Sequence, residues 1–172
     1  MVRNATFEPV CTETDQVALA AMAREIWFEY WPATLGEAQT AYMVDQFQSL
    51  EAIQRDMADH GYEYWFVCAA DDGRRVGYTG GHVEPETGRF FISKIYLMRE
   101  ERGKHFASAV IAMYEELCRT RGLDAMYLTV NKGNELGIRA YRGQGFTVID
   151  AVETDIGHGF IMDDYIMEKR VG

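Results

Sequence analysis

The sequence has few prolines and cysteines, and it lacks a long uninterrupted apolar stretch. Its 172 residues include three prolines and three cysteines. The cysteines (Cys11, Cys68 and Cys118) lie far apart and form no CxxC pair, so they indicate neither a disulfide framework nor a metal site. No apolar run reaches the length of a membrane helix, and the amino-terminal "MVRNATFEPV" lacks the apolar segment of a signal peptide. We therefore expect a cytoplasmic protein that has no membrane association and binds no metal.

Positive charge is also scarce. The chain has 17 Lys and Arg against 27 Asp and Glu, and its formal net charge is −10. Such a surface repels nucleic-acid phosphates, which argues against a DNA or RNA partner. An acidic surface attracts cationic substrates, although in many enzymes it serves solubility alone. Apolar residues make up 48% of the chain, enough for the core of one domain, and we predict a single domain over residues 1–172.

The order of elements follows from apolar periodicity, capping residues and turn signals. Strands are expected at 5–10, 63–70, 74–84, 89–98, 125–131, 146–155 and 159–169. Helices are expected at 12–31, 36–48, 49–61, 102–122 and 134–145. This order predicts an α/β fold with a mixed, mostly antiparallel sheet of six to seven strands and helices on both faces.

The stretch "YLMREERGKHFASAV" (96–110) has the outline of an anion-binding loop. A strand ends near Met98, a short charged loop follows, and the expected helix has Gly103 in its first turn. Backbone amides at a helix N-terminus bind anions because they lack acceptors within the helix and lie at the positive end of its dipole. Arg102 and Lys104 add positive charge in an acidic chain. Taken alone, the stretch also fits an ordinary solvated turn before a helix.

A second stretch, "VNKGNELGIRAYRGQGF" (130–146), places polar and small residues on one helix face. Asn134, Gly137, Ile138 and Tyr141 follow the spacing i, i+3, i+4 and i+7. On that face a phenol and an amide could meet the same ligand. Each residue also has a structural interpretation, Asn134 as a helix cap and Tyr141 as an amphipathic residue at the edge of the core.

Together the two stretches resemble the GNAT superfamily of acyl-CoA-dependent N-acyltransferases. The family's pyrophosphate loop, Q/R-x-x-G-x-G/A, is matched by Arg102-Gly103-Lys104-His105-Phe106-Ala107 at every defined position except His105, where the family has glycine. The later signature N-x-x-A/G-x-x-x-Y-x-x-x-G-F is matched in full by Asn134, Gly137, Tyr141, Gly145 and Phe146. Two motifs in the right order and on the right elements are more specific than either alone.

The resemblance implies acetyl-CoA as co-substrate, held between two splayed strands, "KIYLM" and "AMYLTVN". It implies that Tyr141 protonates the departing CoA thiolate after an amine has attacked the thioester. For His105, we expect an exposed residue of the first helical turn, tolerated because its Cβ faces away from the pyrophosphate. Glu29, His82 and Glu84 are possible general bases by position, and ordered water is an alternative. The cofactor-binding residues implied are Tyr96, Leu97, Arg102, Gly103, Lys104, His105, Phe106, Ala107 and Asn134.

The acceptor is expected to be an amine-bearing small molecule or peptide, and the family also suggests a possible homodimer. Tyr30 and Trp31, at the end of the first long helix, lie where the family forms one wall of its acceptor cleft. The acidic carboxy-terminal hairpin around Asp163 and Asp164 is expected to be a closing pair of strands with charged outer faces; an acidic rim that attracts a cationic acceptor is the alternative. One alternative is a non-catalytic acyl-CoA-binding regulatory domain. A toxin-like enzyme acting on aminoacyl-tRNA is another, and the acidic charge argues against it.

Overall fold

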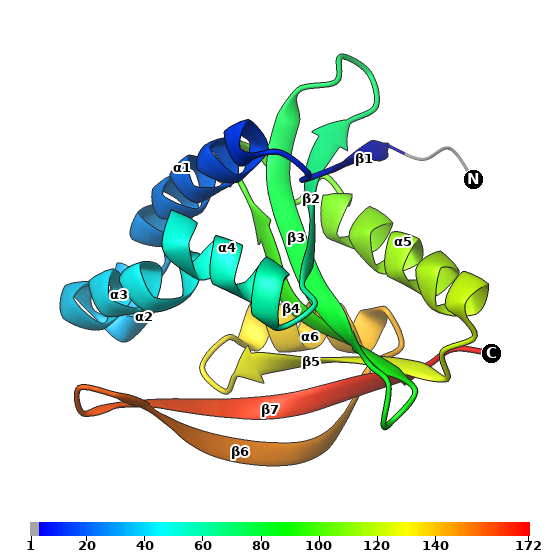
Figure 1. The fold of residues 1–172 in the computed structure, drawn as a ribbon. Helices are drawn as coiled ribbons and strands as arrows, with labels where there is room; N and C mark the ends of the chain where they lie inside the picture. The colour runs from blue at the N-terminus through cyan, green and yellow to red at the C-terminus, as the bar shows by residue number, and fades with distance from the viewer. Residues whose placement is uncertain (1–3) are drawn as a thin grey trace. The chain divides into compact units, whose positions relative to one another are not determined.

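The computed structural model describes residues 4–172 and forms a seven-stranded mixed sheet in the order β1-β2-β3-β4-β5-β7-β6 (Figure 1). The strands are β1 (Ala5–Pro9), β2 (Glu63–Ala69), β3 (Arg75–Glu84), β4 (Arg89–Leu97), β5 (Ala125–Asn131), β6 (Thr147–Gly157) and β7 (Phe160–Arg170). The α-helices are α1 (Glu13–Tyr30), α2 (Pro32–Leu35), α3 (Glu37–Met43), α4 (Leu50–Asp59), α5 (Phe106–Arg121) and α6 (Glu135–Gly143). The predicted α/β class and the mostly antiparallel sheet are confirmed.

The chain divides into two compact units. The first comprises the residues up to His82 together with Lys94–Val110, and the second comprises Val83–Ser93 and Ile111–Gly172. Strands β3 and β4 and helix α5 contribute residues to both units. Each unit is described below by itself.

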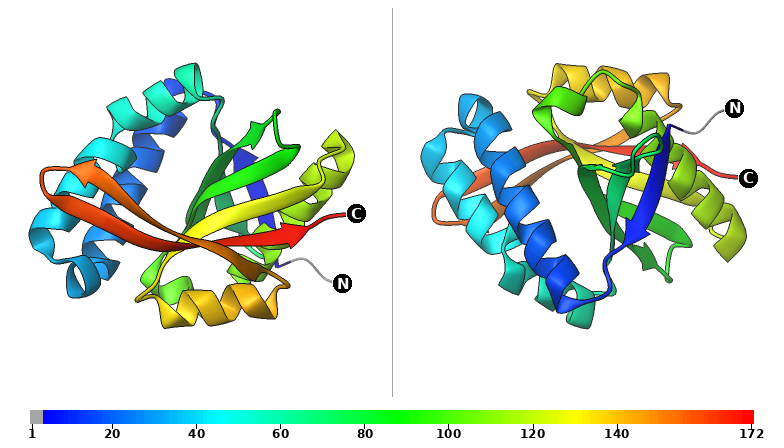
Figure 2. Two further views of the ribbon diagram at one scale, coloured as in Figure 1. Left: turned by 90° about the horizontal axis from the view of Figure 1, so that it is seen from below. Right: turned by 90° about the horizontal axis from the view of Figure 1, so that it is seen from above.

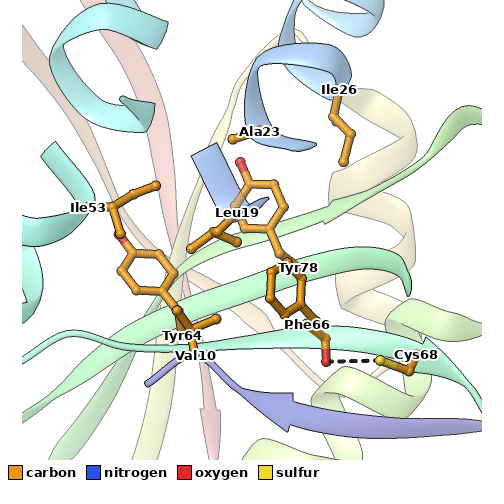
Figure 3. Packing of buried hydrophobic residues seen from close by; sticks show 9 residues of the cluster. All are labelled: Val10, Leu19, Ala23, Ile26, Ile53, Tyr64, Phe66, Cys68 and Tyr78. Carbon is orange, nitrogen blue, oxygen red and sulfur yellow. Dashed lines mark hydrogen bonds between the residues drawn. The ribbon is translucent and has the colours of Figure 1, made fainter. Parts of the chain in front are cut away.

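The first unit is built on α1 and α4. Thr12 caps α1 in a capping box: its side chain accepts from the Asp15 amide, and the Asp15 carboxylate accepts from the Thr12 amide. Ser49 caps α4 through the Ala52 amide. Side chains of both helices pack on β2 and β3 in one apolar cluster (Figure 3), formed by Val10, Leu19, Ala23, Ile26, Ile53, Tyr64, Phe66, Cys68 and Tyr78.

The helix expected over 36–48 is interrupted in the structure. After α3 the chain forms a π-helical turn, η1 (Val44–Gln48), before Ser49 starts α4. Short π-helical segments are rare and often occur at functional sites. No helix within residues 4–172 combines the length and apolar character that a bilayer crossing requires.

In the second unit, β6 and β7 form a long, twisted antiparallel ribbon next to β5 (Figure 2). Arg89–Ile92 of β4 pairs with Ala125–Leu128 of β5 in parallel register. Helix α5 covers one face of these strands: Tyr114 packs on Phe90 at 5.0 Å between ring centroids, and Glu115 forms an ion pair with Lys169 of β7.

Candidate functional site

The loop before α5 differs from the prediction at its helical end. The helix begins at Phe106, so Gly103 lies in the loop and not in the first helical turn. The first intrahelical bond runs from the Ala109 amide to the His105 carbonyl (3.3 Å). The helix therefore contains no acceptor for the amides of its first two residues, Phe106 and Ala107, which is the arrangement that binds anions.

His105 is exposed, as predicted, but the reason why glycine is favoured at this position is different. Gly103 and His105 both have left-handed backbones, with φ of 79° and 67°. A Cβ strains this conformation in any non-glycine residue. The family's glycine at this position therefore matches a requirement of the backbone itself. His105 is a strained loop residue that precedes the helix.

The basic side chains of the loop are already paired with carboxylates. Arg102 Nη2 donates to Glu29 Oε2 at the end of α1 (2.7 Å), and the guanidinium lies 4.7 Å from the centroid of the Tyr30 ring. Lys104 Nζ donates to Glu101 Oε2 (3.1 Å), which also accepts from Arg74. Hydrogen bonds from Arg74, more than the other contacts, hold the pKa of Glu101 below its usual value. The loop therefore offers an anion its backbone amides more than free cationic side chains, and cofactor binding by Arg102 and Lys104 stays a prediction.

The end of β4 is held against β3 by a close backbone approach. A Cβ on Gly77 of β3 would lie 2.2 Å from the carbonyl oxygen of Tyr96 and 2.9 Å from the Leu97 side chain. The Met98 amide donates to the Val76 carbonyl (2.8 Å). Gly77 thus sets the position of the backbone at Tyr96 and Leu97. The sequence contains its signal, a glycine inside a strand pattern, but we did not single it out.

Tyr30 and Trp31 belong to an aromatic cluster. The Trp31 ring lies 4.9 Å from Tyr30 and 5.4 Å from Trp27, and Trp27 meets the Tyr96 ring edge-on at 5.3 Å. Trp31 is 9% exposed, while Tyr30 is half-buried. Within residues 4–172, the buried indole nitrogens of Trp27 and Trp31 meet no hydrogen-bond acceptor. The cluster joins α1 to Tyr96, which is one of the residues implied to hold the cofactor.

A buried lysine on β4 was not predicted. Lys94 is 5% exposed, and its Nζ donates to the Phe47 carbonyl of η1 (2.7 Å) and to the Tyr64 hydroxyl (2.8 Å). Burial lowers the pKa of Lys94 to about 8, and the charge of Asp56 opposes that shift. Lys94 thus fastens the π-helical turn to the strand whose end carries Tyr96.

Helix α6 gives each residue of the second motif a structural task. Asn134 caps the helix by accepting from the Gly137 amide (2.9 Å), and a Cβ on Gly137 would lie 2.6 Å from the Asn134 side chain. Gly145, with φ of 96°, ends the helical conformation. The next amide, of Phe146, donates to the Tyr141 carbonyl (3.0 Å), and the two rings meet edge-on at 5.8 Å. The motif therefore orients a half-buried Tyr141 on a short helix that is capped at its start and ended by a glycine.

The three candidate bases have different surroundings. Glu29 is engaged by Arg102 and lies 3.8 Å from Arg99. His82 is half-buried, with its ring centroid 5.0 Å from that of Tyr62. Glu84 accepts from the Tyr127 hydroxyl and pairs with Arg89. Each of these side chains is committed to neighbours within its own unit.

The carboxy-terminal hairpin departs from the expectation of outward charges at one residue. Asp163 is half-exposed and pairs with Lys132 (2.8 Å), as expected for an outer face. Asp164 is 5% exposed instead, and its buried Oδ1 meets no hydrogen-bond donor in the part of the chain that the structure describes. Burial, reinforced by the negative charge of Asp163 and opposed by Lys132, raises the pKa of Asp164 to about 6. The signal was present in the sequence, because two successive residues of one strand point to opposite faces.

Comparisons with known proteins agree with the two motifs. Residues 20–146 match the sequence model of the Acetyltransferase (GNAT) family. The chain is 28% identical over 151 residues to the uncharacterized N-acetyltransferase YjgM of Escherichia coli (strain K12), which covers 86% of this chain and 85% of that protein.

Solved structures share the fold. The PaiA N-acetyltransferase from Thermoplasma acidophilum, in complex with coenzyme A, superposes with a TM-score of 0.77 at 20% identity, covering 96% of this chain and 98% of that one. The spermidine/spermine N-acetyltransferase SpeG from Vibrio cholerae, in complex with manganese ions, gives 0.67 at 17% identity over 97% and 92%. At these identities the likeness concerns the fold alone.

Proposed function

Because the chain belongs to the Acetyltransferase (GNAT) family and is thus an acetyltransferase, we propose that it moves the acetyl group of acetyl-CoA to a primary amine of a small molecule or peptide. The amine attacks the thioester directly, and Tyr141 protonates the CoA thiolate. The whole chain, residues 1–172, acts as one N-acetyltransferase domain, and a homodimer is compatible with this assignment.

The construction of the loop before α5 carries this proposal. Two left-handed residues, Gly103 and His105, lead into the first amides of a 16-residue helix. Backbone turns of this kind form concavities that bind phosphate groups. The amides from Arg102 to Ala107 would hold the pyrophosphate of acetyl-CoA, and the backbone at Tyr96 and Leu97 would hold its pantetheine arm. The PaiA structure, which contains coenzyme A, supports the use of this cofactor by the fold.

Tyr141 is suited to the role of general acid. A phenol stays protonated at neutral pH and gives up its proton only to a strong base, such as a thiolate that is leaving a thioester. The edge-on contact with Phe146 and the cap at Asn134 fix the helix that carries the hydroxyl. Asn134 lies at the start of that helix, where its remaining polar atoms could meet the cofactor.

The acceptor would enter beside Tyr30 and Trp31. Similarity in fold to a spermidine/spermine acetyltransferase and a net charge of −10 both favour a cationic amine. Tyr30 is half-buried and contacts Arg102, so an acceptor beside it would lie next to the cofactor loop.

The test is a thiol-release assay with acetyl-CoA and a panel that includes spermidine, kanamycin, free lysine and a lysine-containing peptide. We expect release with one class of amine. Tyr141→Phe should lower kcat by about 100-fold or more while the affinity for acetyl-CoA, measured by calorimetry, stays unchanged. Tyr165→Phe, on β7, is the matched control and should leave both quantities unchanged. Binding of acetyl-CoA without release by any amine would favour the regulatory, non-catalytic alternative.

A further inference from the structure

Asp164 is a buried carboxylate whose oxygen has no partner. Asp164 is 5% exposed, and its Oδ1 meets no hydrogen-bond donor among the residues that the structure describes. A buried polar atom of this kind costs free energy, and few remain unsatisfied in native proteins. An unsatisfied carboxylate oxygen is an acceptor site for a donor that comes from outside the fold.

The register of the strands shows which face of the sheet Asp164 occupies. Asp164 of β7 lies opposite Asn131 of β5 and Val152 of β6. Residues opposite each other in an antiparallel pair share a face, and successive residues alternate. Lys169, at odd spacing from Asp164, points to the face that α5 covers, where it pairs with Glu115. Asp164 therefore points to the opposite face.

That position is at the carboxyl end of β5. Asn131 is the last residue of β5, and its side chain accepts from the Gly133 amide (2.8 Å) in the turn that leads to α6. Helix α6 then carries Tyr141. Asp164 thus lies one strand away from the segment that joins β5 to the helix of the proposed general acid.

The charged groups around Asp164 compensate its carboxylate only in part. Asp163, the preceding residue of β7, pairs with Lys132 of the β5–α6 turn at 2.8 Å, and Glu153 of β6 lies opposite Asp163. Lys132 is also 5.5 Å from the Tyr165 ring. Lys132, the cation whose charge opposes the rise in the pKa of Asp164, is therefore paired with Asp163, and a bound ammonium would add positive charge at Asp164 itself.

We propose that Asp164 binds the ammonium group of the acceptor and takes a proton from it, so that the amine enters the reaction neutral. This inference rests on the proposed acetyltransferase function. It assigns the base to a residue outside Glu29, His82 and Glu84, each of which already has partners within its unit.

The protons balance as follows for an acceptor ammonium with three N–H bonds. Asp164 takes one proton, which frees the nitrogen lone pair, and later releases it to water. The nitrogen forms a bond to the carbonyl carbon, and the C–S bond breaks with its electron pair moving to sulfur. Tyr141 gives its proton to the sulfur and recovers one from the acylated nitrogen. The third proton stays on the amide product.

The experiment compares wild type, Asp164→Asn and Asp163→Asn in the thiol-release assay, using whichever amine of the panel the wild type acetylates. Asp164→Asn should lower kcat/KM for the amine by at least about 100-fold at pH 7. In the wild type, kcat/KM should fall as the pH is lowered through about 6, where the carboxyl titrates; this fall is called the acidic limb below, and Asp164→Asn should remove it. Asp163→Asn should keep a limb but move it to lower pH, because the charge of Asp163 helps to raise the pKa of Asp164, and it should keep most of the rate at pH 7. Affinity for coenzyme A, measured by calorimetry, should be equal in all three proteins.

The outcomes separate the two proposals. No thiol release by the wild type with any amine would overturn the acetyltransferase function and the role of Asp164 with it. An active wild type together with an Asp164→Asn variant that keeps its rate and its acidic limb would overturn the role of Asp164 alone. If Asp164→Asn does not fold, the acidic limb of the wild type is measured at several temperatures. The pKa of a carboxyl changes little with temperature, so a limb whose pKa changes as that of an imidazole does would refute the assignment.

Discussion

Replacing Asp164 with asparagine should stabilise the protein at neutral pH. The pKa of Asp164 is raised from 3.8 to about 6, first by burial and then by the charge of Asp163. A raised carboxyl pKa means that the folded protein favours the protonated form. The ionised carboxylate therefore lowers the free energy of unfolding, and this loss is absent below pH 3.8, grows up to pH 6 and is complete above it. At 1.36 kcal/mol per pKa unit this interval corresponds to about 3 kcal/mol. Asparagine has nearly the same shape and no charge.

The measurement is the free energy of unfolding by urea, followed by circular dichroism between pH 4 and pH 7. The difference between Asp164→Asn and wild type should grow by about 2–3 kcal/mol over this range, whatever the two proteins show at pH 4. At pH 7 this corresponds to a melting temperature higher by about 5–10 °C for a chain of this size. Asp163→Asn, which removes the pair with Lys132 and one of the two causes of the raised pKa of Asp164, should show a clearly smaller growth, because burial is the larger cause and remains. Parallel pH curves for Asp164→Asn and wild type would refute the reasoning.

Substitutions at His105, Gly77 and Asn134 test the construction of the site. His105→Gly removes a side chain from a backbone at φ 67°, and it should raise stability by up to about 1 kcal/mol in thermal unfolding without weakening coenzyme A binding. Gly77→Ala places a Cβ 2.2 Å from the Tyr96 carbonyl, and it should cost about 2 kcal/mol or more in urea unfolding, whereas Gly143→Ala, with open space around it, should cost nothing. Asn134→Ala should lower the free energy of unfolding by about 1 kcal/mol because it removes the helix cap, whereas Asn134→Asp should keep the cap. Equal KM values for acetyl-CoA in wild type and Asn134→Asp would show that the amide group itself makes no cofactor contact.

Much of the fold follows from local signals that the structure uses as expected. Thr12 and Ser49 cap α1 and α4, and Asp72-Gly73 lies between β2 and β3 with Gly73 in the left-handed conformation. These features depend on a few neighbouring residues, so sequence alone reveals them. The π-helical turn at Val44–Gln48 depends on a distant partner, because Lys94 of β4 holds the Phe47 carbonyl. No local pattern in the helix could predict it.

The site shows the same division. The second motif is local, and the cap at Asn134, the room at Gly137 and the contact of Phe146 with Tyr141 all lie within 13 residues. Sequence patterns say less where two distant segments meet. Arg102 of the loop is paired with Glu29, although no close sequence neighbour indicates it, and Asp164 is buried beside Asn131, although alternation alone does not say which face of the strand is buried. Pairing and burial of charges depend on tertiary contacts.

His105 and Asp164 both lower the stability of the fold, but for different reasons. Strain that the fold does not require is informative when its removal also changes function. For His105 the family pattern itself contains the relieved residue, glycine, so His105→Gly should gain stability and keep activity. For Asp164 we expect the opposite coupling, with asparagine gaining stability and losing acetyl transfer. If both variants gain stability and both stay active, the buried carboxylate of Asp164 is a tolerated cost, as His105 is. If Asp164→Asn gains stability but loses acetyl transfer while His105→Gly keeps it, the carboxylate is retained for its chemistry.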